Sequence, residues 1–244
     1  MKFLKNHPFA VKAHFDSSVV LTFAVPKAEL KPFIPECLEL ETFENKWAFI
    51  AVAMVQTRHL RPKVLPRRFG SDFFLVGYRI FVKYTNKKGK KLRGLYIIKS
   101  QTDNEKMKFF GNIFTHYNYT TTDIKQHKSN DLKIIKSTES DFEIKINERA
   151  ENVKIPLGSP FKTWKEARKF AGPLPFTFTV NTKFKTILTI LGVRQNWKPN
   201  PIEITDYHFK FLNELSIDKV VLANAFEIKN IPYEWKKGKI ERWK

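Results

Sequence analysis

The sequence has very little cysteine: Cys37 is the only one among 244 residues. A disulfide framework needs paired cysteines in an oxidising compartment, so a disulfide-stapled secreted fold is excluded. The longest uninterrupted apolar run spans residues 47–55, which is shorter than the ~18 residues of a membrane-crossing helix. The charged residues 1–8 precede no apolar stretch typical of a secretory signal. We therefore expect a cytoplasmic protein with no membrane-spanning segment and no membrane partner.

Glycine is also scarce, with nine residues, and the chain contains no GxGxxG, GxxxxGKS/T or GxSxG pattern. Loops of the first two kinds cradle phosphates, so nucleotide chemistry is not expected. The six histidines show none of the HxH, HxxxH or HExxH spacings, and no cysteine pair could complete a zinc site. We therefore expect no metal and no cofactor.

Acidic residues are too few to balance the basic ones: 24 Asp and Glu face 44 Lys and Arg, a net charge of +20. Nucleic acid, an anionic membrane and acidic substrates are the partners that such a charge suggests. Residues 58–93 hold twelve cations and one acid. Only ten of the 44 cations are Arg, the residue that bidentate recognition of phosphates and bases prefers. We therefore interpret the basic residues of this segment as parts of a solvated loop and a solvated hairpin tip. An anion-binding face is the alternative.

Runs rich in Val, Ile, Phe and Tyr, bounded by Pro, Asn, Asp and Gly, recur along the chain and predict a β-dominated protein. Turn formers in residues 86–90 predict a hairpin between the strands that flank them. Helices are predicted over residues 26–33, 103–114 and 163–171. The predicted strands cover residues 17–25, 38–43, 46–56, 72–85, 91–101, 114–121, 131–147, 175–181, 185–191, 202–212 and 219–228.

No linker or repeat interrupts these elements, so we expect one domain over residues 1–244. The polar stretch 137–158 contains the alternating segment 142–146 and is expected to continue the same sheet. A long open sheet would leave edge strands with unpaired backbone N–H and C=O groups, which closure of the sheet removes. The prediction is a mainly β (α+β) fold, in which a strongly curved antiparallel sheet closes into a barrel with a few peripheral helices.

Arg79 lies in the predicted strand 72–85, where both alternating sets of neighbours are apolar, and burying a polar group without a partner costs about 1–3 kcal/mol. Lys99 interrupts the next apolar strand in the same way. Counted from the hairpin turn, Arg79 falls opposite Tyr96 or Ile97, so Lys99 is expected nearby on the same face. Two cations would then line a cavity that attracts carboxylates. The alternative is an ion pair with a core acid or snorkelling at a rim.

A polar and aromatic set follows this hairpin. His116 and Asn118 share one face of the predicted strand 114–121, and Tyr119 lies on the other face. A hydrogen-bonded structural histidine is the alternative to catalysis at His116.

Eight segments of the sequence resemble an uncharacterised bacterial family, a domain of unknown function within the acetoacetate decarboxylase-like superfamily. They extend over nearly the whole chain. The resemblance implies a cone-like, highly curved β-barrel with a central cavity. The segments are residues 11–15, 21–26, 49–58, 72–82, 92–95, 111–119, 170–178 and 222–226.

Acetoacetate decarboxylase uses a lysine Schiff base, whose amine is activated by a neighbouring cation in a dry pocket. The corresponding residues 99–108 contain lysines but no adjacent lysine pair, and the decarboxylase's cavity carboxylates have no match in this sequence. The roles that the resemblance implies are carboxylate binding by Arg79, an amine from Lys99 or Lys106, and proton transfer by His116 and Tyr119. Gln56, Gln101 and Asn118 complete the predicted substrate-binding set.

Three functions stay open at this point. The first is a lyase-like enzyme acting on a keto or carboxylic acid. The second is a non-catalytic ligand-binding β-barrel, and the third is a binder of anionic surfaces or single-stranded nucleic acid through residues 58–93. The expected partner is a small anionic or keto molecule rather than nucleic acid, and the sequence leaves a homo-oligomer open.

Overall fold

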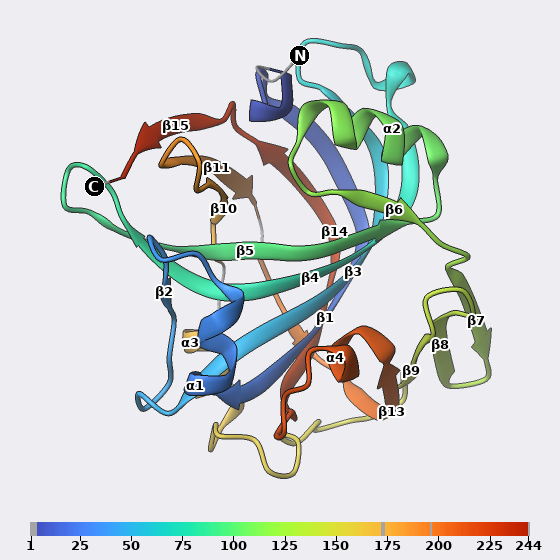
Figure 1. The fold of residues 1–244 in the computed structure, drawn as a ribbon. Coiled ribbons are helices and arrows are strands. Elements are labelled where there is room, and N and C mark those ends of the chain that lie inside the picture. Colours follow the sequence, from blue (N-terminus) through green and yellow to red (C-terminus); the bar gives the residue numbers. More distant parts are fainter. Residues whose placement is uncertain (1–3, 172–173, 196, 244) are drawn as a thin grey trace.

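A computed structural model describes residues 4–171, 174–195 and 197–243. Seven strands pair in a closed ring, in the order β14, β1, β3, β4, β5, β10, β11 and back to β14 (Figure 1). This closure confirms the strongly curved, barrel-like sheet with few helices. The bounds are β1 Val11–Pro26, β3 Trp47–Pro62, β4 Ser71–Thr85, β5 Lys91–Thr102, β10 Phe176–Asn181, β11 Thr186–Arg194 and β14 Val221–Trp235.

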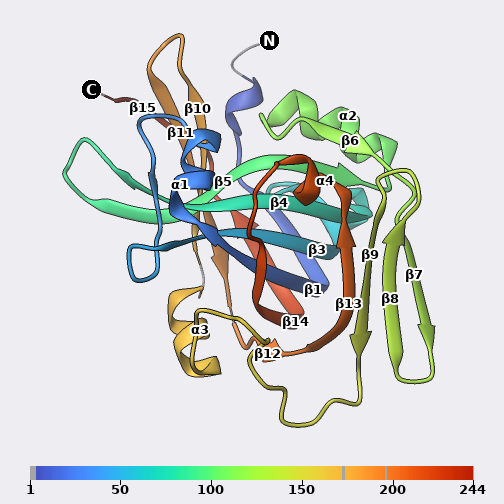
Figure 2. The same ribbon diagram turned by 60° about the horizontal axis from the view of Figure 1, so that its bottom comes forward.

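Short strands extend this sheet at its margins, and four others form a second, separate sheet (Figure 2). The marginal strands are β2 Glu39–Leu40, β6 Tyr119–Thr121, β12 Asn200–Pro201 and β15 Lys239–Arg242. The second sheet contains β7 Lys125–Ser129, β8 Leu132–Ser137, β9 Phe142–Asn147 and β13 Glu203–Phe209.

The helices are short and peripheral, and none in the described part of the chain could cross a membrane. The α-helices are α1 Lys27–Leu30, α2 Glu105–Phe114, α3 Trp164–Phe170 and α4 Lys210–Glu214. The 3-10 helices are η1 Leu4–Asn6, η2 Lys31–Phe33 and η3 Arg67–Phe69.

Strand β4 shows why the barrel strands are apolar on both faces. Val76, Tyr78 and Ile80 belong to the main hydrophobic core, which also contains Ile144 of the second sheet. The alternate set, including Arg79, lines a cavity inside the ring. Because side chains alternate along a strand, one face of β4 packs against the second sheet and the other faces the barrel interior.

The ring closes where β5 meets β10, and this pairing is parallel, with Gly94 opposite Phe176. A Cβ atom at residue 94 would collide with the Phe176 carbonyl oxygen. Glycine lets two backbones approach this closely, so Gly94 is part of the closure. The expected antiparallel pairing holds at the other joints of the ring, and the two parallel pairings among the described strands are this one and β5–β6.

Three sequence-based assignments need correction. The predicted strand 114–121 is a helix end followed by irregular chain, and β6 begins only at Tyr119, so His116 and Asn118 do not share a strand face. The predicted strand 131–147 is a two-stranded hairpin in the second sheet and does not continue the barrel. The predicted strand 202–212 ends as α4. Alternation alone does not reveal where a strand turns back.

Candidate functional site

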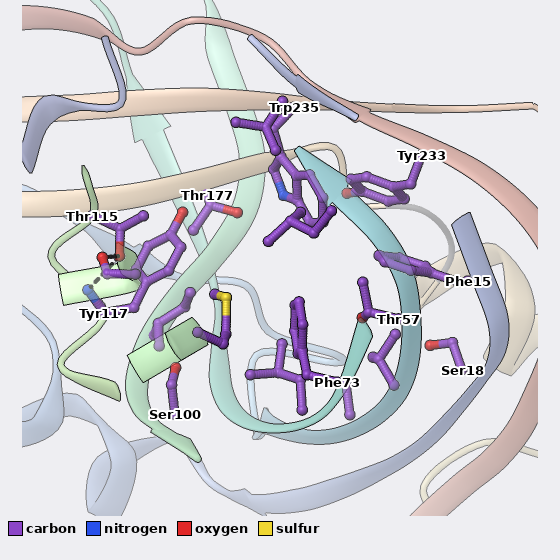
Figure 3. A pocket seen from close by; sticks show the side chains of 18 of the residues that line it. Phe15, Ser18, Thr57, Phe73, Ser100, Thr115, Tyr117, Thr177, Tyr233 and Trp235 are labelled. Atoms are coloured by element: carbon purple, nitrogen blue, oxygen red, sulfur yellow. Dashed lines mark hydrogen bonds between the residues drawn. The ribbon is translucent and has the colours of Figure 1, made fainter. Parts of the chain in front are cut away.

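A cavity of about 570 Å³ occupies the interior of the ring, within the range of about 300–1,000 Å³ that is typical of small-molecule sites. Figure 3 shows side chains from opposite walls, Tyr117 and Thr177 on one side and Phe15, Tyr233 and Trp235 on the other, directed toward the same space. The strands of the ring thus surround one shared volume.

The lining is mainly aliphatic and aromatic, and its charged members are all basic. No Asp or Glu is present among the described lining residues. The basic lining residues are His7, Arg61, Arg79, Lys106 and Arg194. A cavity with this composition suits a ligand that combines an apolar body with a negative group.

Arg79 supplies the central charge of the cavity. Its Nε atom is buried without a hydrogen-bond partner, and no carboxylate of the described chain forms an ion pair with its guanidinium. Burial lowers the pKa of Arg79, and the phenols of Tyr233, Tyr119 and Tyr117 act in the opposite direction. An arginine still keeps its proton at neutral pH. The guanidinium folds over Gly77, where an added Cβ would lie 3.0 Å from Nε.

Arg194, at the end of β11, is a second, half-buried cation of the cavity. Its Nη2 donates to the Leu174 carbonyl oxygen at 3.3 Å, and its guanidinium carbon lies 4.0 Å from the centre of the Trp197 ring. Burial lowers the pKa of Arg194, Tyr233 opposes this shift, and the charge of Arg79 adds to it. The two guanidinium groups therefore influence each other electrostatically, across a cavity whose described lining contains no acidic side chain.

Two phenols accompany Arg79. Burial raises the pKa of both Tyr117 and Tyr119, so both keep their protons at neutral pH. The Tyr117 hydroxyl is hydrogen-bonded to Thr177, whereas the Tyr119 hydroxyl is able to donate to a ligand oxygen. The Asn112 side chain of α2 donates to the Tyr119 carbonyl oxygen at 2.9 Å and accepts from its N–H at 2.7 Å. These two hydrogen bonds to the backbone hold β6, and with it Tyr119, against α2.

The cavity reaches solvent between α2 and the segment that follows β3. Four of the described lining residues are exposed: Leu65, Phe69, Lys106 and Phe110. The first two lie in the segment that contains η3, and the other two lie on α2, so these two elements form the mouth.

Lys99 does not line this cavity, and a β-bulge is the cause. Tyr78 pairs with Lys99, whereas Arg79 pairs with Ile97, which leaves Ile98 as an extra residue on β5. The pairing of Arg79 with Ile97 agrees with the hairpin count, but the bulge turns Lys99 to the opposite face. Its ammonium lies 4.4 Å from the centre of the Phe211 ring. Burial lowers the pKa of Lys99, Glu214 opposes the shift, and Lys210 adds to it.

Of the eight predicted site residues, three line the cavity: Arg79, Lys106 and Tyr119. Besides Lys99, the four others lie elsewhere. Gln101 donates a hydrogen bond to Ser140, and Gln56 accepts one from Gln126 at 2.9 Å. His116 lies 3.1 Å from the Asn6 side-chain oxygen, and burial, assisted by Lys5, lowers the pKa of His116. Asn118 is exposed and has a left-handed backbone conformation, with a φ of 50°.

The sequence-based reasoning missed Arg194, Tyr233 and Trp235. Arg194 ends a strand, a position that is normally solvated. Tyr233 and Trp235 alternate with Glu234, a period-2 signal that continues β14 beyond the predicted end at residue 228. In the described residues, no group of three His, Cys, Asp or Glu side chains is placed to hold a metal ion.

Comparison with known proteins places this fold among decarboxylase-like structures. The family model DUF2071, described as an uncharacterized conserved protein, matches residues 12–227. No curated protein matches the sequence significantly. Acetoacetate decarboxylase from Legionella pneumophila subsp. pneumophila str. Philadelphia 1 has a TM-score of 0.62 at 14% identity, over 96% of this chain and 88% of that chain.

Two further structures have the same fold at lower similarity. An acetoacetate decarboxylase-like enzyme from Sphingomonas wittichii RW1 has a TM-score of 0.56 at 11% identity, over 96% of this chain and 93% of that chain. The enduracididine biosynthesis enzyme MppR, complexed with pyruvate, has a TM-score of 0.53 at 10% identity, over 96% and 90%. Identities this low establish a shared fold and carry no residue roles.

Proposed function

This chain belongs to the DUF2071 family, and we propose that its barrel cavity binds a small organic carboxylate with an apolar body. Arg79 is the observation that carries the proposal. It is a cation without an ion-pair partner in the described structure, inside an apolar cavity that has no acidic lining residue. A strongly desolvated charge in a cleft is typical of a functional site. A cytoplasmic location, with Cys37 reduced, is part of the proposal.

The chemistry of the lining favours a carboxylate over other anions. A guanidinium holds a carboxylate through two parallel N–H···O bonds, and the Tyr119 phenol is a donor close to it. The aliphatic and aromatic walls would bury the rest of the ligand, with a gain of about 25 cal/mol for each Å² of apolar surface removed from water. The proposed ligand is therefore a monocarboxylate whose charged end pairs with Arg79 and whose apolar body packs against the aliphatic and aromatic walls.

Binding of matched ligands tests this proposal in the unmodified protein. We expect octanoate to bind at least about tenfold more tightly than octanol, because a hydrogen bond to a charged group contributes about 1.5–3 kcal/mol. Isothermal titration calorimetry at neutral pH measures both affinities. Equal affinities for the acid and the alcohol, or no binding of either, would refute the proposed carboxylate site.

The same titration has a defined pH dependence. Arg79 favours the ionised ligand, so the bound carboxyl group has a lower pKa than the free acid. Affinity is then constant above the pKa of the free acid, which is about 4–5 for ordinary carboxyl groups, and it weakens as the pH falls below that value. Octanol, which has no carboxyl group, serves as the control and should show no loss in this range.

A second candidate function is catalysis on a keto acid, favoured by the presence of Lys106 and Tyr119 in the same cavity as Arg79. A lysine amine that attacks a ketone carbonyl forms an imine and releases water, and borohydride reduces the imine to a stable secondary amine. After treatment with pyruvate and borohydride, we expect peptide mapping by mass spectrometry to find an adduct on Lys106 and none on Lys99. The Lys106→Arg variant keeps the charge and should lose the adduct. An adduct on Lys99 would contradict the strand register described above.

A further inference from the structure

The mouth of the cavity is bordered by exposed apolar side chains, some of which, such as Phe69 and Phe110, also line the cavity and others of which, such as Val64 and Phe109, do not. Val64 is 87% exposed, Phe69 58%, Phe109 62% and Phe110 52%. They come from two elements that border one opening, the segment containing η3 and the helix α2. The Phe109 and Phe110 rings contact each other, with centroids 5.3 Å apart. Exposed apolar groups gathered at one site mark an interaction surface.

Cations are interspersed with these apolar residues. Arg67, Arg68 and Lys106 are exposed and have no ion-pair partner in the described parts of the chain. The Arg68 guanidinium lies 5.1 Å from the centre of the Phe69 ring. Arg61 holds the segment in shape, because its Nε donates to the Leu65 carbonyl oxygen at 3.1 Å. The rim patch, as we call it, consists of Val64, Leu65, Arg67, Arg68, Phe69, Lys106, Phe109 and Phe110.

We propose that the rim patch docks onto an anionic phospholipid surface, with the cavity mouth facing the bilayer. Amphipathic surfaces that bind peripherally place apolar side chains among the acyl chains and Lys or Arg at the headgroups. The rim patch has both components around a single opening. The cavity behind it is apolar, so a ligand with an apolar body would pass between bilayer and cavity without crossing water.

The charge distribution favours a lipid surface over nucleic acid. Phosphate backbones are bound by extended rows of cations. The lysine cluster at residues 87–91 does not extend the rim patch, because it lies on the β4–β5 hairpin tip, far from α2 and η3 in Figure 1. The cations of the rim patch alternate instead with side chains suited to acyl chains. This proposal departs from the sequence-based expectation of no membrane partner, although the chain still has no described helix that could span a bilayer.

Vesicle co-sedimentation of the full chain tests the proposal. We expect binding to vesicles that contain phosphatidylglycerol and little binding to vesicles of phosphatidylcholine alone. The double variant Val64→Ser/Phe109→Ser should bind about tenfold or more weakly, because two apolar side chains no longer enter the bilayer. The double variant Arg67→Gln/Arg68→Gln should bind roughly 25-fold more weakly at low salt. None of these four residues lines the cavity, so octanoate binding in solution should persist in both variants.

Matched controls come from elsewhere on the surface. Leu157 and Ile240 are 102% and 51% exposed, and Leu157→Ser/Ile240→Ser should bind vesicles as the unmodified protein does. Lys87→Gln/Lys88→Gln removes two charges at the hairpin tip and should have a smaller effect than the Arg67/Arg68 variant. No binding to anionic vesicles, or equal losses in rim and control variants, would overturn the proposal. So would binding of a single-stranded oligonucleotide, without vesicle binding, that depends on Arg67 and Arg68.

Discussion

Replacing Arg79 with methionine is expected to weaken octanoate binding by about 30-fold or more, because removal of one partner from a buried charge pair costs about 2–5 kcal/mol. Methionine has a similar length and no charge, so octanol affinity should change little. Without ligand, the variant should be more stable than the unmodified protein by about 1–3 kcal/mol, since a buried unsatisfied polar group is removed. Urea unfolding and titration calorimetry measure the two effects.

The opposite signs of these two effects make the Arg79 prediction specific. Replacing a residue that only supports the fold would lower the stability of the protein. Replacing a binding residue that has no partner in the free protein should instead raise the stability and lower the affinity for the ligand. Lys99→Met is the matched control, because it removes a neighbouring cation from the other face of the sheet. It should leave octanoate binding unchanged. An Arg79→Met variant that binds octanoate normally would exclude Arg79 as the carboxylate site.

Replacing Glu227 with alanine is expected to destabilise the protein by about 3–5 kcal/mol, because it leaves Lys133, whose side chain is only 16% exposed, without its counter-charge. Glu227, on β14, is 8% exposed. Its Oε1 accepts from the Ser17 hydroxyl at 2.6 Å and from Lys133 Nζ at 3.0 Å. Its Oε2 lies 3.1 Å from Nζ of the exposed Lys229, a pair that contributes little. Since Lys133 belongs to β8, this cluster connects the second sheet to the barrel. Urea unfolding measures the change, and hydrogen exchange should show the loss of protection beginning in β8.

Two further variants separate this effect from a general loss of packing. The double variant Glu227→Leu/Lys133→Leu should recover most of the lost stability, since hydrophobic replacement of a whole buried pair is often neutral. Asp206→Ala breaks the exposed pair with Lys145 and should have little effect on stability, because exposed ion pairs contribute little. If the double variant is as unstable as Glu227→Ala, the uncompensated charge is not the cause.

The Glu227 cluster also makes stability depend on pH. Burial pushes the pKa of Glu227 upward, but the Ser17 hydrogen bond and the charge of Lys133 outweigh this and hold it below its ordinary value. A carboxyl group with a lowered pKa in the folded state contributes its stability above the pKa of the unfolded chain, about 4.3. That contribution is lost as the pH falls through the lower, folded pKa. In the Glu227→Gln variant, the free energy of unfolding should therefore fall less steeply as the pH is lowered below about 4.3.

Local patterns predict the strands but not the way the ring is joined. Strand β4 is recognisable because it is apolar on both faces, which is typical of a strand enclosed between two layers. The ring is closed by pairing of β5 with β10 and of β11 with β14, segments far apart in sequence. Strand β7, whose five residues are all exposed, has no apolar pattern and is not predicted.

The residues of the candidate site likewise include some that the sequence predicts and some that it does not. Arg79 can be found from the sequence as a candidate, because it interrupts the otherwise apolar run of residues 73–82. Arg194, Tyr233 and Trp235 cannot, because each lies at or beyond the end of a recognisable apolar run. Lys99 is predicted on the wrong face, because one extra residue, Ile98, shifts the register.

The sequence by itself determined that this chain forms a curved β-sheet and singled out Arg79 as a candidate cavity cation, because alternation and composition are local properties of the chain. Only the tertiary structure decided which cations share the cavity with Arg79, and that its mouth lies between α2 and η3. Those outcomes depend on a β-bulge and on pairing between distant strands. Their energies come from contacts that exist only once the ring is closed.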